Sequence, residues 1–197
     1  MGYLTAEPAL WLFVFLGLFS PGPNVILLTA SGARFGLRRT VPHILGVAVG
    51  VGVIAAAAGA GVSVILLEFP ALDLVLRVAA FCWILWLAYG LLQRKRARAG
   101  TGAKPFTVLQ AALFQWVNPK VWAVAMAAAA GYGHGQGPGA EAARLALVFT
   151  SLNLGVCLFW TAAGGLLSFL LTTPRAWRVF NATMAIFLAL SATAVFL

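Results

Sequence analysis

The chain has 197 residues, of which 62% are hydrophobic and 9% are charged, and its formal net charge is +9. A soluble domain typically has about 45–50% apolar and about 25% charged residues. The composition therefore excludes a water-soluble globule and predicts a surface that faces lipid. The cations form short clusters between long apolar runs, and no nucleic-acid-binding motif is present. This pattern favours a membrane protein over a partner of nucleic acids.

Six apolar stretches are long enough to cross a bilayer core of about 30 Å, which takes about 20 helical residues. No lysine or arginine precedes the first stretch, so we expect it to be a retained span and not a cleaved signal peptide. The predicted fold class is an all-α integral membrane protein with six transmembrane helices. The expected spans are residues 8–31, 41–67, 72–93, 107–130, 144–171 and 177–197.

The connections between these spans alternate in charge. The odd-numbered connections hold most of the 13 lysines and arginines, whereas the even-numbered ones are acidic or balanced. Because basic loops stay on the cytoplasmic side, we expect these connections to be cytoplasmic and both termini to face outward. The basic residues concerned are Arg34, Arg38, Arg39, Arg94, Lys95, Arg96, Arg98, Lys104, Arg175 and Arg178.

Helix-breaking residues interrupt two of the spans at corresponding places. The first span contains Ser20-Pro21-Gly22-Pro23-Asn24, and the fourth contains Asn118-Pro119-Lys120, about half the chain further on. Each interrupted span is the first of three spans. Because each half has an odd number of spans, the second half enters the membrane in the opposite sense. The sequence therefore predicts two inverted three-helix repeats, residues 1–98 and 107–197, joined by a cytoplasmic linker at 99–106.

The prolines in these breaks predict a polar site inside the membrane. Each proline removes an N–H and displaces the carbonyl four residues earlier, which would free the carbonyls of Gly17, Phe19 and Gln115. Free backbone groups are tolerated at membrane depth only beside protein or water, so we expect a cavity. The positive end of the helix that begins near Asn24 suits a carboxylate, and freed carbonyls suit an ammonium group. Together these groups match a zwitterion.

Four polar residues within or beside the spans are further candidates. Lys120 lies near the middle of the fourth span, where a charge is costly and usually functional, although a lysine can also reach an interface. His43, near the cytoplasmic edge of the second span, is either a proton-exchanging group or a hydrogen-bonded interfacial histidine. Asn153 and Asn181 either line a polar path or bond neighbouring helices.

Small residues indicate close helix packing. Gly32 with Gly36, and Gly46 with Gly50, form two GxxxG spacings. Such faces let helix backbones approach closely, and if exposed they would permit a homodimer.

Two alternatives to an organic substrate follow from the residues. Cys82 and Cys157 form no CxxC pair, so neither a disulfide framework nor a zinc site is expected, but two thiols leave transmembrane thiol redox open. Carbonyls freed at the breaks could instead coordinate a metal or other small ion, although the spans contain no cluster of ligands for one. No cofactor and no resident metal are expected.

Two paired motifs and their surroundings resemble a known family. The chain is similar, over essentially its whole length, to the lysine exporter (LysE/RhtB) amino-acid translocators, including the threonine/homoserine exporter type. The residues that carry the resemblance are Pro21-Gly22-Pro23-Asn24, Gly32/Gly36, Gly46/Gly50, the basic segment after Tyr89-Gly90, and Asn118-Pro119-Lys120.

The resemblance implies a transporter and not an enzyme: an exporter of amino acids in the bacterial cytoplasmic membrane, energised by the proton motive force. It also implies that Pro21, Gly22, Pro23 and Asn24 form the transport site with Asn118, Pro119 and Lys120. Many relatives carry an acidic residue in the second span, where this chain has none between Gly50 and Ala55. We therefore expect a neutral substrate, such as homoserine, threonine or a branched-chain amino acid, in preference to lysine.

Overall fold

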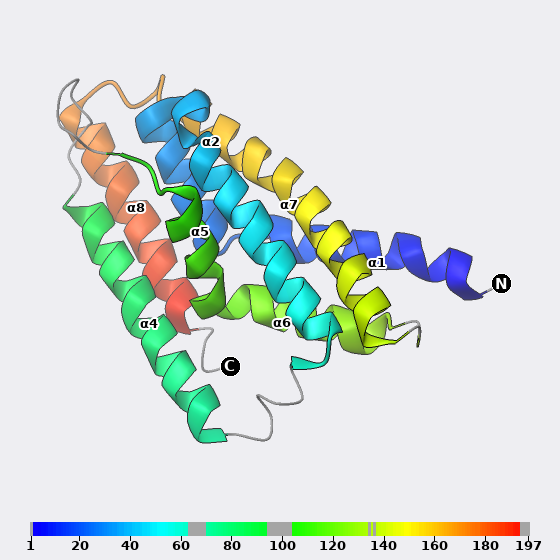
Figure 1. Ribbon diagram of the computed structural model, residues 1–197. Helices are drawn as coiled ribbons and strands as arrows, with labels where there is room; N and C mark the ends of the chain where they lie inside the picture. The colour runs from blue at the N-terminus through cyan, green and yellow to red at the C-terminus, as the bar shows by residue number, and fades with distance from the viewer. Residues whose placement is uncertain (1, 63–69, 94–103, 134, 136, 194–197) are drawn as a thin grey trace.

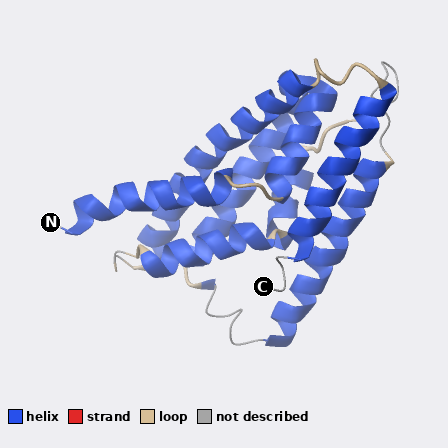
Figure 2. Ribbon diagram, turned by 180° about the vertical axis from the view of Figure 1, so that it is seen from behind, coloured by secondary structure: helices blue, strands red, loops and turns tan. Residues whose placement is uncertain are grey.

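The computed structural model describes residues 2–62, 70–93, 104–133, 135 and 137–193, and no strand occurs among them (Figure 2). The all-α fold class is thereby confirmed for the described part of the chain. In chain order (Figure 1), the elements are α1 (Gly2–Phe19), α2 (Pro23–Gly59), α4 (Pro70–Leu92), α5 (Val108–Phe114), the 3₁₀ helix η1 (Gln115–Val117), α6 (Pro119–Gly131), α7 (Pro138–Leu167) and α8 (Pro174–Thr193).

Helix α2 folds back on itself at Gly36, where φ is 75° and ψ is 169°. Residues with a side chain rarely adopt this backbone conformation, whereas glycine adopts it freely. The two limbs of α2 are antiparallel, so both extend from this bend toward the same end of the molecule (Figure 1). The connection expected between the first two spans is thus a bend at one residue, with helix on both sides.

Helix α2 lies at the centre of the molecule and packs against α5, α6, α7 and α8. Its second limb joins α1, α6 and α7 in one apolar core, which includes Val14, Val51 and Phe149. Its first limb joins α4 and α8 in a second core, which includes Ile84 and Leu188. Each limb therefore lies mainly in one of the two apolar cores.

Glycines of the two GxxxG spacings allow close packing between helices of the same chain. A Cβ on Gly46 or Gly50 would collide with α5, and a Cβ on Gly32 would collide with the Thr161 carbonyl of α7. Gly36 makes no such contact, because it forms the bend. The faces of Gly32, Gly46 and Gly50 are therefore already covered within the chain. The homodimer itself stays a prediction.

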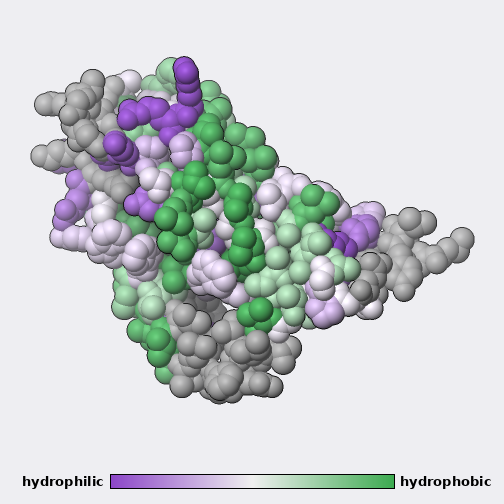
Figure 3. Space-filling model, in the orientation of Figure 1, coloured by the Kyte–Doolittle hydropathy of each residue, from purple (hydrophilic) through white to green (hydrophobic). Residues whose placement is uncertain are grey.

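Large apolar side chains cover the outer faces of the helices. One flank of α2 after the bend is an apolar stripe with an exposed residue at every fourth position: Leu37, Val41, Leu45, Val49 and Val53. Figure 3 shows apolar surface between a hydrophilic area at the end where α2 bends and a smaller one near the N-terminal half of α1. Soluble monomers rarely expose so much contiguous apolar surface. The surface is that of a membrane protein.

Three helices are, by length and composition, long and apolar enough to cross a membrane, and three shorter apolar helices accompany them. The long ones are Pro23–Gly59, Pro138–Leu167 and Pro174–Thr193; the shorter ones are Glu7–Phe19, Arg77–Leu92 and Val108–Val117. Each predicted span contains apolar helix, but the division into six spans stays a prediction.

Several helix boundaries differ from the expected spans. Helix α7 begins at Pro138 instead of residue 144, because a proline is well suited to the first helical position. The helix of the second span ends at Gly59 instead of residue 67. Residues 63–69, which complete that span, and residues 99–103 of the expected linker lie outside the described residues.

An ion-pair cluster ties three helices together at the end of the molecule away from the α2 bend. Arg144 on α7 donates to Glu7 on α1 at 3.0 Å, to the Tyr132 carbonyl after α6 at 2.6 Å, and to Glu141. Both acidic residues whose side chains are described are thus paired with one arginine.

Replacing Arg144 with alanine is expected to destabilise the protein by about 1–3 kcal/mol, because the largely buried Glu141 carboxylate then loses its charged partner. The apparent unfolding temperature in detergent should fall by about 3–8 °C. The control is Arg178→Ala, which removes an exposed arginine of α8. Equal temperatures for the two variants would show that the cluster contributes no stability.

Candidate functional site

Both predicted helix breaks are present, and each is built on an X-Pro step. Gly22 (φ −177°, ψ −177°) and Asn118 (φ −94°, ψ 99°) are extended, as residues before proline usually are. Pro23 then starts α2 and Pro119 starts α6, in the helical position where the missing N–H is harmless. The same local geometry therefore occurs twice.

Three amide side chains join the two breaks. Asn24 Nδ2 donates to Gln115 Oε1 at 2.8 Å, and Gln115 Nε2 donates back to Asn24 Oδ1 at 3.1 Å. Gln115 Nε2 also donates to the Ala111 carbonyl at 2.8 Å, and Asn118 Nδ2 donates to Gln115 Oε1 at 3.2 Å. We call Asn24, Gln115 and Asn118 the amide cluster. It brings together residues about 90 positions apart in the sequence.

One acceptor of the amide cluster has no protein partner. Asn118 is 1% exposed, and its Oδ1 atom makes no hydrogen bond to any part of the chain that the structure describes. Buried polar atoms are nearly always paired, so an unpaired one calls for an explanation. A donor supplied by a ligand is one such explanation.

Lys120 crosses from the second break to the first. Its Nζ atom donates to the carbonyl of Ser20 and lies 3.4 Å from the carbonyl of Pro21. These carbonyls follow the C-terminus of α1, the negative end of the helix dipole, which favours a cation. Gly22 leaves room for this contact, since a Cβ there would lie 2.7 Å from Lys120 Cδ. Lys120 is half-buried beside exposed Ser20 and Pro21, so the ammonium group remains approachable.

The carbonyls expected to be free are not free. The Gly17 carbonyl accepts from Ser20 Oγ at 3.0 Å, and the Phe19 carbonyl accepts from Trp160 Nε1 at 3.2 Å. The Gln115 carbonyl accepts from the Asn118 N–H at 3.1 Å. The prediction that these three would face a ligand is therefore wrong, because neighbouring side chains and a 3₁₀ turn satisfy them. The carbonyls that meet a cation are those of Ser20 and Pro21.

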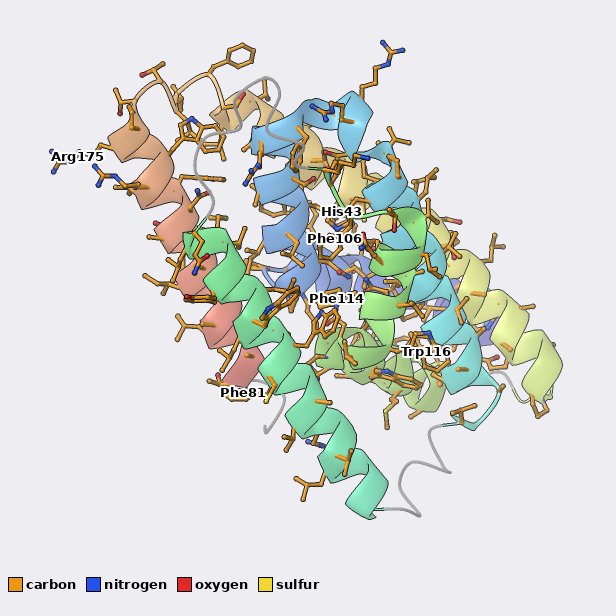
Figure 4. The ribbon with its side chains drawn as sticks, turned by 60° about the vertical axis from the view of Figure 1, so that its left-hand side comes forward. His43, Phe81, Phe106, Phe114, Trp116 and Arg175 are labelled. Atoms are coloured by element: carbon orange, nitrogen blue, oxygen red, sulfur yellow. The ribbon has the colours of Figure 1, made fainter. Side chains whose placement is uncertain are left out.

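The remaining candidates lie apart from the amide cluster. His43 is 3% exposed, and its ring centroid is 5.0 Å from that of Phe106, ahead of α5. Figure 4 shows this pair near one end of α5 and Trp116 beyond the other. Asn153 is buried on α7 and donates to the Val47 carbonyl of α2 at a long 3.5 Å, a bond between helices.

Gln115 belongs to the site, although only its carbonyl was predicted to matter. Its side chain is fully buried and is the one member of the amide cluster that bonds to both others. A signal was present in the sequence, since Gln115 is a polar residue within an apolar span and lies four positions before Pro119.

Together the fold and the site define a membrane protein in which two broken helices meet at a polar cluster, an arrangement used by secondary transporters. Residues 15–197 match the family described as LysE type translocator. The chain belongs to this family, whose members are membrane transporters and not enzymes.

Curated relatives of the chain are named cysteine/O-acetylserine efflux proteins. That of Escherichia coli strain K12 is 27% identical over 117 residues, which are 59% of this chain and 60% of the relative. That of Shigella flexneri is 27% identical over 113 residues, which are 57% of this chain and 58% of the relative. The chain thus spans less than two thirds of the length of these relatives. No solved structure matches the chain.

Proposed function

We propose that this protein exports small neutral amino acids from the cytoplasm by alternating access, driven by the proton motive force. The observation that carries the proposal is the joining of the two breaks by the amide cluster and by Lys120. In transporters with discontinuous helices, substrate binds where such breaks face each other. Pro21, Gly22, Pro23, Asn24, Asn118, Pro119 and Lys120 are the residues that we assign to this transport site, together with Gln115.

The two charged ends of an amino acid have matching groups in this site. The Lys120 ammonium group and the N-termini of α2 and α6 favour the carboxylate. The unpaired Asn118 Oδ1 atom favours a donor, which the α-ammonium group supplies. Binding of the carboxylate would draw Lys120 away from Ser20 and Pro21 and so loosen the link between the breaks.

A neutral side chain on the substrate fits the charges around the site. Among the described side chains, the two carboxylates are Glu7 and Glu141. Both pair with Arg144 of α7, away from the breaks. A cationic substrate would meet Lys120 without a compensating carboxylate. The relatives are named for efflux of cysteine and O-acetylserine, which are small amino acids without a cationic side chain.

The membrane arrangement is part of the proposal. The described basic residues of the odd-numbered connections are Arg34, Arg38, Arg39, Lys104, Arg175 and Arg178. Three of them adjoin the α2 bend and two begin α8, at the hydrophilic end in Figure 3. By the positive-inside bias this end is cytoplasmic, both termini are periplasmic, and the halves 1–98 and 107–197 are inverted repeats. His43, at the same end, is the proposed proton-exchanging residue.

The redox and metal-ion alternatives gain no support from the described residues. Cys157 is buried on α7 and Cys82 is exposed on α4, and these helices lie on opposite sides of α2 in Figure 1. Replacing both cysteines with alanine should leave transport intact, whereas its loss would favour the redox alternative. Inhibition of substrate efflux by competing metal ions would favour the metal-ion alternative.

Export is tested in cells that take up dipeptides and hydrolyse them. Cells with and without the protein are fed dipeptides of threonine, homoserine, cysteine, leucine or lysine, and growth and intracellular amino-acid pools are measured. We expect lower pools and better growth for a subset of the neutral amino acids. Pools that do not differ for any amino acid would contradict export.

A substitution at Gly22 tests the contact of Lys120 with the first break. In Gly22→Ala the added Cβ would push the Lys120 side chain off the Ser20 carbonyl, while this flexible side chain lets the fold persist. A loss of about 1 kcal/mol at this contact corresponds to an efflux rate about fivefold lower. The control is Gly90→Ala on α4, where a Cβ would contact nothing within 4 Å. Equal rates in both variants would remove the contact from the mechanism.

A further inference from the structure

A small cavity lies at the basic end of the molecule, between the first limb of α2, α8 and the segment that precedes α5. Its volume is about 20 Å³, enough for one water-sized group. It is separate from the amide cluster and includes His43 beside Phe106, as labelled in Figure 4. The polar residues that line it are Ser31, Arg34, His43, Trp177 and Asn181.

The groups that line the cavity favour an anionic ligand. Trp177 is 7% exposed, and its Nε1–H makes no hydrogen bond to any described part of the chain. The Arg34 guanidinium also lines the cavity, and none of the described residues that line it is acidic. A buried indole N–H normally finds an acceptor. A cation and an unpaired donor in one cavity match a carboxylate.

Ser31, which lines the cavity, keeps the lone pairs of its hydroxyl oxygen available. Thr40 Oγ1 donates to the Gly36 carbonyl at 2.8 Å and lies 3.1 Å from Ser31 Oγ. A hydroxyl has a single hydrogen, so Ser31 must donate to Thr40 and keeps its own lone pairs. These suit an ammonium group. The cavity thus combines donors for a carboxylate with an acceptor for an ammonium group, the two ends of an amino-acid head group.

The cavity and the amide cluster lie along one face of α2. Counted from Asn24, the residues three, seven and ten positions further on are Leu27, Ser31 and Arg34. This is the spacing of one helical face. From Asn24 to Ser31 the rise is about 10 Å along the helix. The amide cluster therefore lies about two helical turns from the cavity along this face.

We propose that this cavity is a first binding site for the head group of the amino-acid substrate on its way from the cytoplasm to the paired breaks. The inference rests on the proposed export of amino acids and adds a site to it. In the conformation shown the cavity admits only part of a head group, so α8 and the first limb of α2 separate when a whole amino acid enters. Arg34 and Trp177 hold the carboxylate, and Ser31 accepts from the ammonium group.

The test measures transport from the cytoplasmic face in everted membrane vesicles, with radiolabelled O-acetyl-L-serine and L-threonine as probes. Trp177→Phe removes the N–H and keeps the aromatic ring, and Trp86→Phe on the exposed face of α4 is its control. We expect Trp177→Phe to raise the half-saturating concentration about tenfold, equivalent to about 1.4 kcal/mol. The maximal rate should stay within about twofold of that of the wild type. L-Threoninamide, which lacks the carboxylate, should compete equally well in both proteins.

A second pair of variants separates the cavity from the general positive charge at this end. Arg34→Gln and Arg38→Gln remove the same charge, but Arg38 is exposed on the other side of the bend. We expect Arg34→Gln alone to raise the half-saturating concentration. Two results would overturn this inference and leave export standing, provided that the wild type transports the probes. One is an unchanged half-saturating concentration in Trp177→Phe, and the other is an equal effect of the two arginine variants. Wild-type vesicles that transport neither probe would overturn both.

Discussion

Replacing Lys120 with methionine is expected to lower amino-acid efflux at least tenfold, while the protein still inserts and stays folded. Methionine matches the length of the lysine stem but removes the charge that meets the Ser20 carbonyl and, in our proposal, the substrate carboxylate. A hydrogen bond to a charged group contributes about 1.5–3 kcal/mol, which corresponds to a change of about ten- to a hundredfold. Efflux from cells loaded with radiolabelled L-threonine measures the effect.

The stability of the same variant distinguishes transport from simple capping of α1. A charge within a span costs roughly 2.5–3.5 kcal/mol on insertion scales, so its removal should not destabilise the protein. The control is Lys104→Met, which removes an exposed lysine ahead of α5. If Lys120→Met unfolds at a lower temperature than the wild type and yet exports normally, Lys120 has a structural role and leaves the transport site.

Substituting valine for Gly32 or Gly164 is expected to give the largest loss of stability. A Cβ on Gly32 would collide with the Thr161 carbonyl of α7, and a Cβ on Gly164 would collide with the Thr29 carbonyl of α2. Backbone atoms cannot move aside as a side chain can, so α2 and α7 must separate. Overpacking of this kind costs about 1–3 kcal/mol or more, so the apparent unfolding temperature should fall by about 5 °C or more.

Gly155→Val is the matched control, because it places the same β-branched residue in α7 where a Cβ meets nothing within 4 Å. Size-exclusion chromatography of heated, detergent-solubilised protein provides the measurement. A loss as large in Gly155→Val as in Gly164→Val would assign the effect to helix propensity and would contradict the close crossing of α2 and α7.

The helix breaks could be predicted from the sequence because local chemistry determines them. Proline disfavours helical backbone in the residue before it and starts a helix well, so Pro23 and Pro119 mark where α2 and α6 begin. Helix α4, Pro70–Leu92, lies close to the expected span 72–93 for a similar reason, since its apolar run has clear polar flanks. The positions of the breaks follow from a few neighbouring residues.

The partners of the breaks could not be predicted, because they depend on packing between distant segments. Nothing near Phe19 indicates that Trp160 will satisfy its carbonyl, and nothing near Asn24 indicates its pairing with Gln115. Gly36 could be taken for a packing residue because its spacing from Gly32 is the same as in a GxxxG pair. Its positive φ is visible only in the folded chain.

Counterflow in proteoliposomes tests the central claim most directly, since it needs substrate binding and alternating access but no energy source. Vesicles with purified protein are loaded with unlabelled O-acetyl-L-serine or L-threonine, and transient uptake of the radiolabelled compound is followed. The account predicts uptake by the wild type, none by Asn118→Leu, which lacks the buried Oδ1 acceptor, and none of L-lysine. Counterflow that Asn118→Leu retains in full, or that occurs for L-lysine and not for the neutral amino acids, would contradict it.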